Sequence, residues 1–260
     1  TSTDTVPLDE WTHVAVMVAA GSHAYYLNGV PSGGGAVNYT IHFSQVVEHI
    51  PYLIGGAWIS LQVAFLAFCG GMVIGLFGAM AKTFGGVIIR RVVDVYVSFI
   101  TNTPQLVQIY FLYFALPEAG IILDSYEAVL LGMTLNAGGY LTEIQRAGFL
   151  SVRRSELEAA ETLGMNLMQQ VRYVILPHIM KVLFPSLSNL YILMTLGTSM
   201  AAIFGLEELT GRALNINAET FRSIEVFSLT AVLYFFVTVA ASLTLLFVGR
   251  VFFRVKGKVF

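Results

Sequence analysis

Long uncharged blocks dominate the pattern of hydrophobic and polar positions along this chain. Four blocks lack Asp, Glu, Lys and Arg over 23 to 33 residues each. A helix needs about 20 apolar residues to cross the hydrocarbon core of a bilayer, so each block predicts a transmembrane helix. The four blocks are residues 49–81, 95–117, 182–206 and 226–249.

A fifth uncharged block, residues 128–142, is only 15 residues long. To cross a bilayer its helix must extend past Glu127 and Glu143, which places both carboxylates near the membrane faces. We therefore predict an all-α, polytopic membrane protein with a five-helix transmembrane domain over residues 51–255. The predicted spans are residues 52–81, 88–116, 125–148, 181–206 and 224–250.

The composition agrees with this class and excludes several others. Hydrophobic residues make up 56% of the chain and charged residues 12%, against about 45–50% and about 25% in soluble domains. The net charge of −2 argues against nucleic-acid binding, which needs a basic surface. A single cysteine, Cys69, excludes an internal disulfide framework. The five histidines have no metal-ligand spacing, so we predict no metal site.

Basic residues gather in every second connection between the predicted spans. Twelve of the 14 lie there, whereas the other connections hold only Arg212 and Arg222. Because Lys and Arg are retained on the cytoplasmic side, we expect the N-terminus outside and the C-terminus inside, as an odd number of spans requires. The twelve residues are Lys82, Arg90, Arg91, Arg146, Arg153, Arg154, Arg172, Lys181, Arg250, Arg254, Lys256 and Lys258.

The beginning of the chain is predicted to stay outside the membrane. Its longest purely apolar stretch is residues 14–20, and Pro31 and the three glycines at residues 33–35 follow. Such residues break helices and mark turns, so we expect residues 1–41 to form an extracytoplasmic tail of irregular structure. Residues 11–30 also resemble one hairpin of a laminin-G-type lectin sheet, although this segment is too short to build that domain.

A short amphipathic helix is predicted directly before the first span. Phe43, Val46, Val47 and Ile50 fall at positions i, i+3, i+4 and i+7, which is the spacing of one helix face. We expect residues 42–50 to lie as a helix in the outer membrane interface.

The loop between the third and fourth predicted spans has the sequence of two short helices. Ser155 is a candidate N-cap with Glu158 in capping-box position. Gly164 interrupts the first helix, and a second helix starts at about Asn166. The two helices would form a compact cytoplasmic projection with small and apolar residues for contact with a partner protein. The alternative is a loop packed against the underside of the protein itself.

This loop resembles the EAA loop of ABC importer permeases. The match is E-A-A-x-x-x-G at residues 158–164, followed after nine residues by V-I-L-P at residues 174–177. Other segments resemble the polar amino-acid branch, the permeases for histidine, glutamine, glutamate and arginine. These segments are T-N-T-P-Q-L-V-Q at residues 101–108, L-N-A-G-G-Y-L-T-E-I at residues 135–144 and S-L-S-N-L at residues 186–190.

The resemblance implies a type I importer core in which this chain forms half of the translocation pathway. Two permease subunits, homologous or identical, would face each other in a bacterial inner membrane. Two ATP-binding subunits would lie on the cytoplasmic side and a periplasmic amino-acid-binding protein outside. The loop at residues 151–178, called the coupling loop below, would dock into an ATP-binding subunit. The residues implied in this coupling are Glu158, Ala159, Ala160 and Gly164.

The chain contains no G-x-x-x-x-G-K-[ST] phosphate loop, so ATP and Mg would bind in the partner ATPase. We expect no cofactor and no enzymatic activity in this chain. Two charges typical of the family are missing, because Thr101 replaces the arginine before G-T-P, and L-G-T-S-M at residues 196–200 replaces K-D-T-S-L. This departure fits a heteromeric pair of permeases or a changed substrate preference, with N-T-P resembling permeases for acidic amino acids.

Polar side chains within the predicted spans indicate a substrate route, because polar groups in membranes usually face a cavity or a neighbouring helix. Amides and hydroxyls can bind a zwitterionic amino acid without a fixed charge. The alternative is that they bond across helix pairs, which contributes about 0.6 kcal/mol on average. The candidate route residues are Gln108, Asn136, Tyr140, Thr198 and Ser199.

Three further features of the sequence lead to local predictions. Pro104 is expected to kink the second span. Asp94 is expected to pair with Arg90, four residues before it. Glu207 and Glu208 lie in an outer loop, where they either contact a solute-binding protein or are simply solvated.

A secondary amino-acid transporter or channel is the alternative function. Such a protein typically has internal repeats with broken helices in matching positions, and the sequence has none. A membrane-embedded enzyme would need a cluster of His, Asp or Glu at one membrane depth. The predicted spans offer no such cluster.

Overall fold

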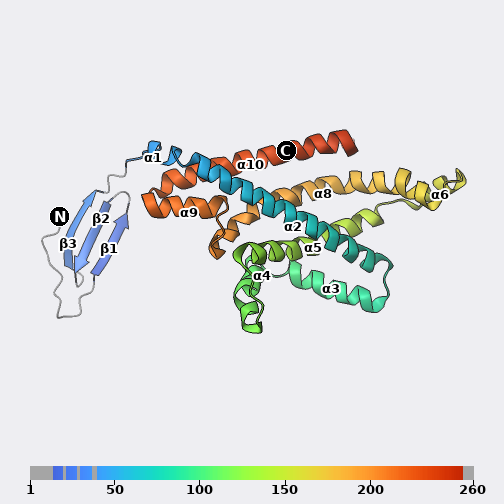
Figure 1. The fold of residues 1–260 in the computed structure, drawn as a ribbon, viewed down its shortest axis with the longest axis horizontal. Helices are drawn as coiled ribbons and strands as arrows, with labels where there is room; N and C mark the ends of the chain where they lie inside the picture. Colours follow the sequence, from blue (N-terminus) through green and yellow to red (C-terminus); the bar gives the residue numbers. More distant parts are fainter. Residues whose placement is uncertain (1–13, 20–21, 28–29, 37–39, 254–260) are drawn as a thin grey trace. The chain divides into compact units, whose positions relative to one another are not determined.

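The computed structural model describes residues 14–19, 22–27, 30–36 and 40–253 (Figure 1). The chain divides into two compact units, Thr1–Gln45 and Val46–Phe260. The smaller unit contains three strands, and the larger unit contains the long helices.

The first unit contains a sheet of three antiparallel strands. They pair in the order β1-β2-β3, so the prediction of an irregular tail over residues 1–41 is wrong for these segments. Glycine and proline break helices, but β3 can hold them because it is an edge strand of the sheet, and only one of its sides pairs with another strand. The pairing of β1 with β2 agrees with the alternative of a single hairpin in this region. The strands are β1 (Val14–Ala19), β2 (Ser22–Leu27) and β3 (Val30–Ala36).

The predicted interfacial helix at residues 42–50 is shorter than its apolar stripe. Helix α1 covers only Ser44–Val47, and a turn follows at residues 48–49. Val46 is fully buried, whereas Val47 is 49% exposed. One residue of the stripe is therefore part of the core, and its neighbour is not.

The second unit is a bundle of helices. Successive long helices run in opposite directions along the bundle (Figure 1), as expected of a chain that crosses a membrane repeatedly. The helices are α2 (Ile50–Phe84), α3 (Val87–Thr101), α4 (Gln105–Tyr110), α5 (Ser125–Leu150), α6 (Arg154–Thr162), α7 (Leu167–Gln170), α8 (Leu176–Gly197), α9 (Leu209–Thr220) and α10 (Ser223–Phe253).

In the described part of the chain, three helical stretches are long and apolar enough to cross a membrane: Ile50–Phe84, Leu167–Phe204 and Ser223–Val251. They contain the first and fifth predicted spans and all of the fourth except residues 205 and 206. The fourth helix starts well before the predicted residue 181, because the π-helical turn Val171–Ile175 joins α7 to α8 without a break. The second and third spans stay predictions.

The second predicted span, residues 88–116, is interrupted. Helix α3 ends at Thr101, α4 begins at Gln105, and Pro104 lies between them in extended conformation, with φ −61° and ψ 133°. Proline lacks a backbone N–H and disfavours helical geometry in the residue before it. The expected kink is therefore a full break in the helix.

Small residues bring α2 and α5 into close contact. Gly71, Gly75 and Gly78 lie on α2 where it meets α5. A Cβ atom at Gly75 would come within 2.6 Å of the Cβ of Leu141 and 2.8 Å of its carbonyl carbon. The two backbones can approach this closely only because α2 has no side chain at this position, as is common in membrane helix pairs.

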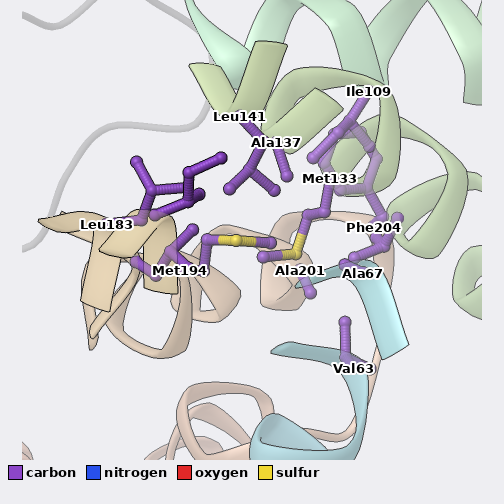
Figure 2. Close-up of a cluster of buried hydrophobic side chains, with 13 residues drawn as sticks. Val63, Ala67, Ile109, Met133, Ala137, Leu141, Leu183, Met194, Ala201 and Phe204 are labelled. Carbon is purple, nitrogen blue, oxygen red and sulfur yellow. The ribbon is translucent and has the colours of Figure 1, made fainter. Parts of the chain in front are cut away.

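The main hydrophobic core lies where α2, α5 and α8 meet (Figure 2). Ala67 of α2 is fully buried there, and Met133 and Met194 approach from α5 and α8. A second cluster, which includes Leu53 and Leu209, packs α9 against α2. The first cluster includes residues of α4, of α5 and of the segment 198–204, which carry the candidate route residues.

Candidate functional site

The coupling loop lies at one end of the helical unit. In Figure 1, α6 forms the tip, beyond the end of α5 and the start of α8. Helix α2 ends and α3 begins towards the same end (Figure 1). The loop projects from the bundle, which favours contact with a partner over the alternative of packing against the protein's own underside.

The two helices of the coupling loop begin differently. Helix α6 has Arg153 at its N-cap and no side-chain cap, so the predicted cap at Ser155 is wrong. The helix starts earlier than predicted, and Arg154 and Glu158 pair across its first turn, with Nε and Oε1 3.0 Å apart. Helix α7 begins as predicted, and Asn166 caps it with a complete capping box.

Gly164 ends α6 in the left-handed conformation, with φ +72°. Its N–H donates to the carbonyl oxygen of Glu161 at 2.9 Å, and the N–H of Met165 donates to that of Ala160 at 3.1 Å. These are the two bonds of a Schellman C-cap. A Cβ at Gly164 would meet no atom within 4 Å, so the backbone conformation is the reason that glycine is required here.

Apolar side chains cover the tip of the coupling loop. Leu163, Leu167 and Met168 are 73 to 75% exposed. An exposed group of large apolar side chains marks an interaction surface when it lies outside the lipid. The tip therefore has the composition of a docking surface.

The residues implied in coupling divide between the surface and the interior. Glu158, Ala159 and Gly164 are exposed, whereas Ala160 is 2% exposed. A small residue at the Ala160 position lets the helix pack against its own loop. Contact with a partner would involve the other three.

His178 fixes the base of the coupling loop. Its Nε2 lies 3.1 Å from the carbonyl oxygen of Ser151, and its Nδ1 lies 3.5 Å from Oε2 of Glu156. These contacts connect the first turn of α8 with the end of α5 and with α6. The base is tied to the bundle while the tip is free to contact a partner.

Gln108 and Asn136 contact each other within the helix bundle. The Nδ2 of Asn136 donates to Oε1 of Gln108 at 3.1 Å. The Nε2 of Gln108 lies 3.0 Å from the carbonyl oxygen of Ile100 and 3.2 Å from that of Thr103. Gln108 thus supplies donors to carbonyl groups that the break at Pro104 leaves without helical partners. For Gln108 and Asn136 the structure therefore has the alternative named above, in which polar side chains bond across a helix pair.

Tyr140, Thr198 and Ser199 lie in different environments. Tyr140 is 42% exposed on α5. Thr198 is fully buried, and its hydroxyl donates to the carbonyl oxygen of Thr195 at 2.7 Å. Ser199 lines a cavity of about 480 Å³, called the Ser199 cavity below. Ser199 is thus the candidate route residue with direct access to this cavity.

The Ser199 cavity also has residues that the sequence did not single out. Tyr234 and Thr238, one turn apart on α10, form its polar wall, and Leu196, Ala231 and Phe235 complete it. The only available signal was their spacing of four residues within an apolar span. That spacing carries no information about what lies opposite.

Glu208 is not part of an exposed outer surface. Its side chain is fully buried at the N-cap of α9, so the expectation that it is solvated or contacts a binding protein is wrong. Burial raises the pKa of the Glu208 carboxyl, while hydrogen bonds from Thr210, Gly211, Tyr234 and Ser60 act in the opposite direction. Glu207 is exposed, as expected.

An ion cluster joins three helices at the coupling-loop end of the bundle. The Nζ of Lys82 on α2 lies 2.6 Å from Oδ1 of Asp94 on α3 and also contacts Glu143 on α5. Arg146 lies 3.5 Å from Glu143. Asp94 therefore pairs with Lys82, and the expected pair with Arg90 is wrong. The charges hold the helices together near the base of the coupling loop.

The family of the chain follows from comparison with known proteins. Residues 71–256 match the family described as the binding-protein-dependent transport system inner membrane component. The chain belongs to this family. The match includes the coupling loop, the Ser199 cavity and Glu208, and it begins beyond the strands of the first unit.

Relatives of the permease cover most of its length. The glutamine transport system permease protein GlnP of Escherichia coli (strain K12) is 38% identical over 205 residues, which are 78% of this chain and 94% of GlnP. The L-cystine transport system permease protein TcyB of Bacillus subtilis (strain 168) is 34% identical over 187 residues, 72% of this chain and 80% of TcyB.

A solved structure has the same fold as the permease. It is described as the crystal structure of an amino acid ABC transporter with histidines, with a TM-score of 0.74 and 32% sequence identity, and the match covers 82% of this chain and 99% of that one. The permease is thus an α-helical membrane subunit with the type I ABC importer fold. It is a transport subunit and not an enzyme, because ATP hydrolysis in these importers belongs to separate subunits. A secondary transporter or channel is not favoured.

Proposed function

We propose that this permease carries polar amino acids inward across the bacterial inner membrane as half of an ATP-driven translocation pathway. The observation that carries the proposal is the coupling loop, a projection with a glycine-terminated helix and an exposed apolar tip. The names of the relatives, which specify glutamine and L-cystine, support an amino-acid substrate.

The proposed complex contains the permease and several partners. A second permease, homologous or identical, completes the pathway. Two ATP-binding subunits bind the coupling loops, and a periplasmic amino-acid-binding protein delivers the substrate. ATP and Mg bind in the ATP-binding subunits. The exposed apolar side chains of the coupling loop support a protein partner at this end of the bundle, because exposed apolar surface outside lipid is otherwise unfavourable.

The proposed topology has five spans, with the N-terminus outside and the C-terminus inside. The alternating directions of the long helices support it (Figure 1), as does the concentration of basic residues at the coupling-loop end. The second span would cross as the interrupted pair α3 and α4. Backbone groups freed inside a membrane must find partners within the protein, and Gln108 provides such a partner for Ile100 and Thr103.

The proposed substrate route runs along the Ser199 cavity. The hydroxyl group of Ser199 offers hydrogen bonds there, and the apolar side chains around it fit the aliphatic part of an amino acid. Gln108, Asn136, Tyr140 and Thr198 would then support the route by holding α4, α5 and α8 in position.

Uptake by the purified complex in proteoliposomes tests the function. A panel of L-glutamine, L-glutamate, L-arginine and L-cystine should include at least one amino acid that accumulates only when ATP is supplied on the coupling-loop side. Uptake that continues without ATP and collapses with the ion gradient would contradict the proposal.

A variant of the coupling loop tests the mechanism. Gly164→Val forces a β-branched residue into a left-handed conformation, so we expect the ATP-binding subunits to dissociate or to hydrolyse ATP without transport. Gly86→Val is the matched control, because Gly86 has φ −68° and open space around it. Equal uptake by the two variants would refute the role of Gly164.

A further inference from the structure

A buried carboxylate joins three helices beside the Ser199 cavity. Glu208, at the N-cap of α9, accepts four hydrogen bonds, all from uncharged donors. Its Oε1 accepts from the N–H of Gly211 at 2.9 Å, and its Oε2 accepts from the N–H of Thr210 at 3.0 Å, the hydroxyl of Ser60 at 3.0 Å and the hydroxyl of Tyr234 at 3.0 Å. Ser60 is on α2 and Tyr234 is on α10.

This arrangement connects α9 to α2 and α10 through one carboxylate, in addition to the apolar cluster that packs α9 against α2 and to the contact between the hydroxyls of Thr210 and Tyr234 at 2.9 Å. A fully buried carboxylate is costly unless donors replace its water shell. Each donor therefore contributes more than a surface hydrogen bond, and hydrogen bonds to charged acceptors are about twice as strong as neutral ones. The position of α9 depends on the position of the Tyr234 and Ser60 hydroxyls.

Tyr234 has a second role that Ser60 does not have. Its side chain also forms part of the wall of the Ser199 cavity. The phenol ring is rigid, and the tyrosine side chain rotates about only two torsion angles. A displacement of the ring therefore displaces the hydroxyl as well. A hydrogen bond at 3.0 Å has little tolerance, because the interaction is lost by about 3.6 Å. A molecule in the cavity that shifts the ring also loosens or tightens the cap of α9.

We propose that Tyr234 is a positioning residue that transmits occupancy of the Ser199 cavity to helix α9 through its hydrogen bond to Glu208. The inference rests on the proposed function, because it takes the transported amino acid as the occupant of the cavity. In an importer, α9 would then respond to substrate without contacting it. Coupling of this kind requires two distinct sites and an element that both sites influence. The two sites are the Ser199 cavity and the Glu208 carboxylate, and the element is α9.

The test uses the complete complex in proteoliposomes and the amino acid from the uptake panel that wild type transports. Tyr234→Phe keeps the ring in the cavity wall and removes the hydroxyl. We expect its half-saturating amino-acid concentration to stay within about twofold, while the substrate-dependent rise in ATPase rate falls about tenfold, the factor that a hydrogen bond to a charged acceptor represents. An unchanged rise would overturn the inference.

A matched variant separates transmission from simple support of α9. Ser60→Ala removes another hydroxyl from the same Oε2 without touching the cavity, and it should keep the substrate-dependent rise in ATPase rate. If Ser60→Ala loses it as fully as Tyr234→Phe, Tyr234 is only a structural anchor and the inference fails.

Hydrogen exchange keeps the inference testable even if Tyr234→Phe does not assemble. Addition of the transported amino acid to the wild-type complex should change the exchange rates of amides in Leu209–Thr220. Rates that do not respond would overturn the inference while leaving the transport function intact. A wild-type complex that accumulates no amino acid would instead remove the proposed function, and the inference with it.

Discussion

The contact between α2 and α5 gives the sharpest stability prediction. Replacing Gly75 by valine adds a Cβ at 2.6 Å from the Cβ of Leu141, 2.8 Å from its carbonyl carbon and 3.0 Å from the backbone nitrogen of Thr142. Non-bonded carbon atoms rest at about 3.5–4.0 Å. Two of these three neighbours are backbone atoms, so rotation of a side chain cannot relieve the overlap, and the helices must separate by about 1 Å.

The cost of this separation follows from packing. A gap of 0.5–1 Å forfeits about a quarter to a half of each dispersion contact along the interface, and overpacking typically costs about 1–3 kcal/mol. We expect Gly75→Val to fall at the upper end, about 3 kcal/mol, because its branch adds two methyl groups at the same point. For a chain of this size that corresponds to a Tm lower by about 6–12 °C.

The assay is thermal melting of the permease purified in detergent, with the fraction that stays folded measured by size-exclusion chromatography. Gly86→Val is the control, since nothing lies within 4 Å of a Cβ there, and its Tm should match wild type. Leu141→Ala should not rescue Gly75→Val, because alanine keeps the Cβ and the backbone that cause the overlap. A Gly75→Val permease that melts within about 2 °C of wild type would refute the close approach of the two backbones.

Three further predictions concern the charges, the coupling loop and the break in the second span. Lys82→Met should lower the Tm by about 4 °C because it removes the cation that Asp94 and Glu143 share and leaves Glu143 with only the longer contact to Arg146. Lys181→Met, at an exposed position, should not change the Tm, and equal melting of the two variants would contradict the ion cluster. Asn166→Ala removes the cap of α7 and should weaken binding of the ATP-binding subunits in a pull-down by a factor that reflects about 1 kcal/mol, and unchanged binding would mean that α7 does not need its cap to dock. Gln108→Leu should destabilise the permease more than Asn136→Ala, because both variants lose the amide pair but only Gln108→Leu also removes donors from two backbone carbonyls. The reverse order in thermal melting would contradict this role of Gln108.

Features that depend on neighbouring residues were available from the sequence. The uncharged blocks predicted helices of membrane length because transfer of a segment into lipid depends on its own composition. The start of α7 at about Asn166 and the interruption at Gly164 were also predicted, since both depend on hydrogen bonds within a few residues. The strands of the first unit were missed although Asn28 and Gly29, a typical hairpin pair, stand between β2 and β3.

The tertiary structure decided which polar and small groups meet. One such contact joins Lys82 to Asp94, 12 positions further along the chain. Another brings the backbone at Gly75 against that at Leu141. Ser60 and Glu208 are separated by 148 positions along the chain and by 3.0 Å in space. Local composition determined that this chain forms helices in a membrane, because burial of each segment in lipid is a property of that segment. The partners of its charges and hydroxyls depended on how the helices pack, because each interaction needs groups from distant segments at one point.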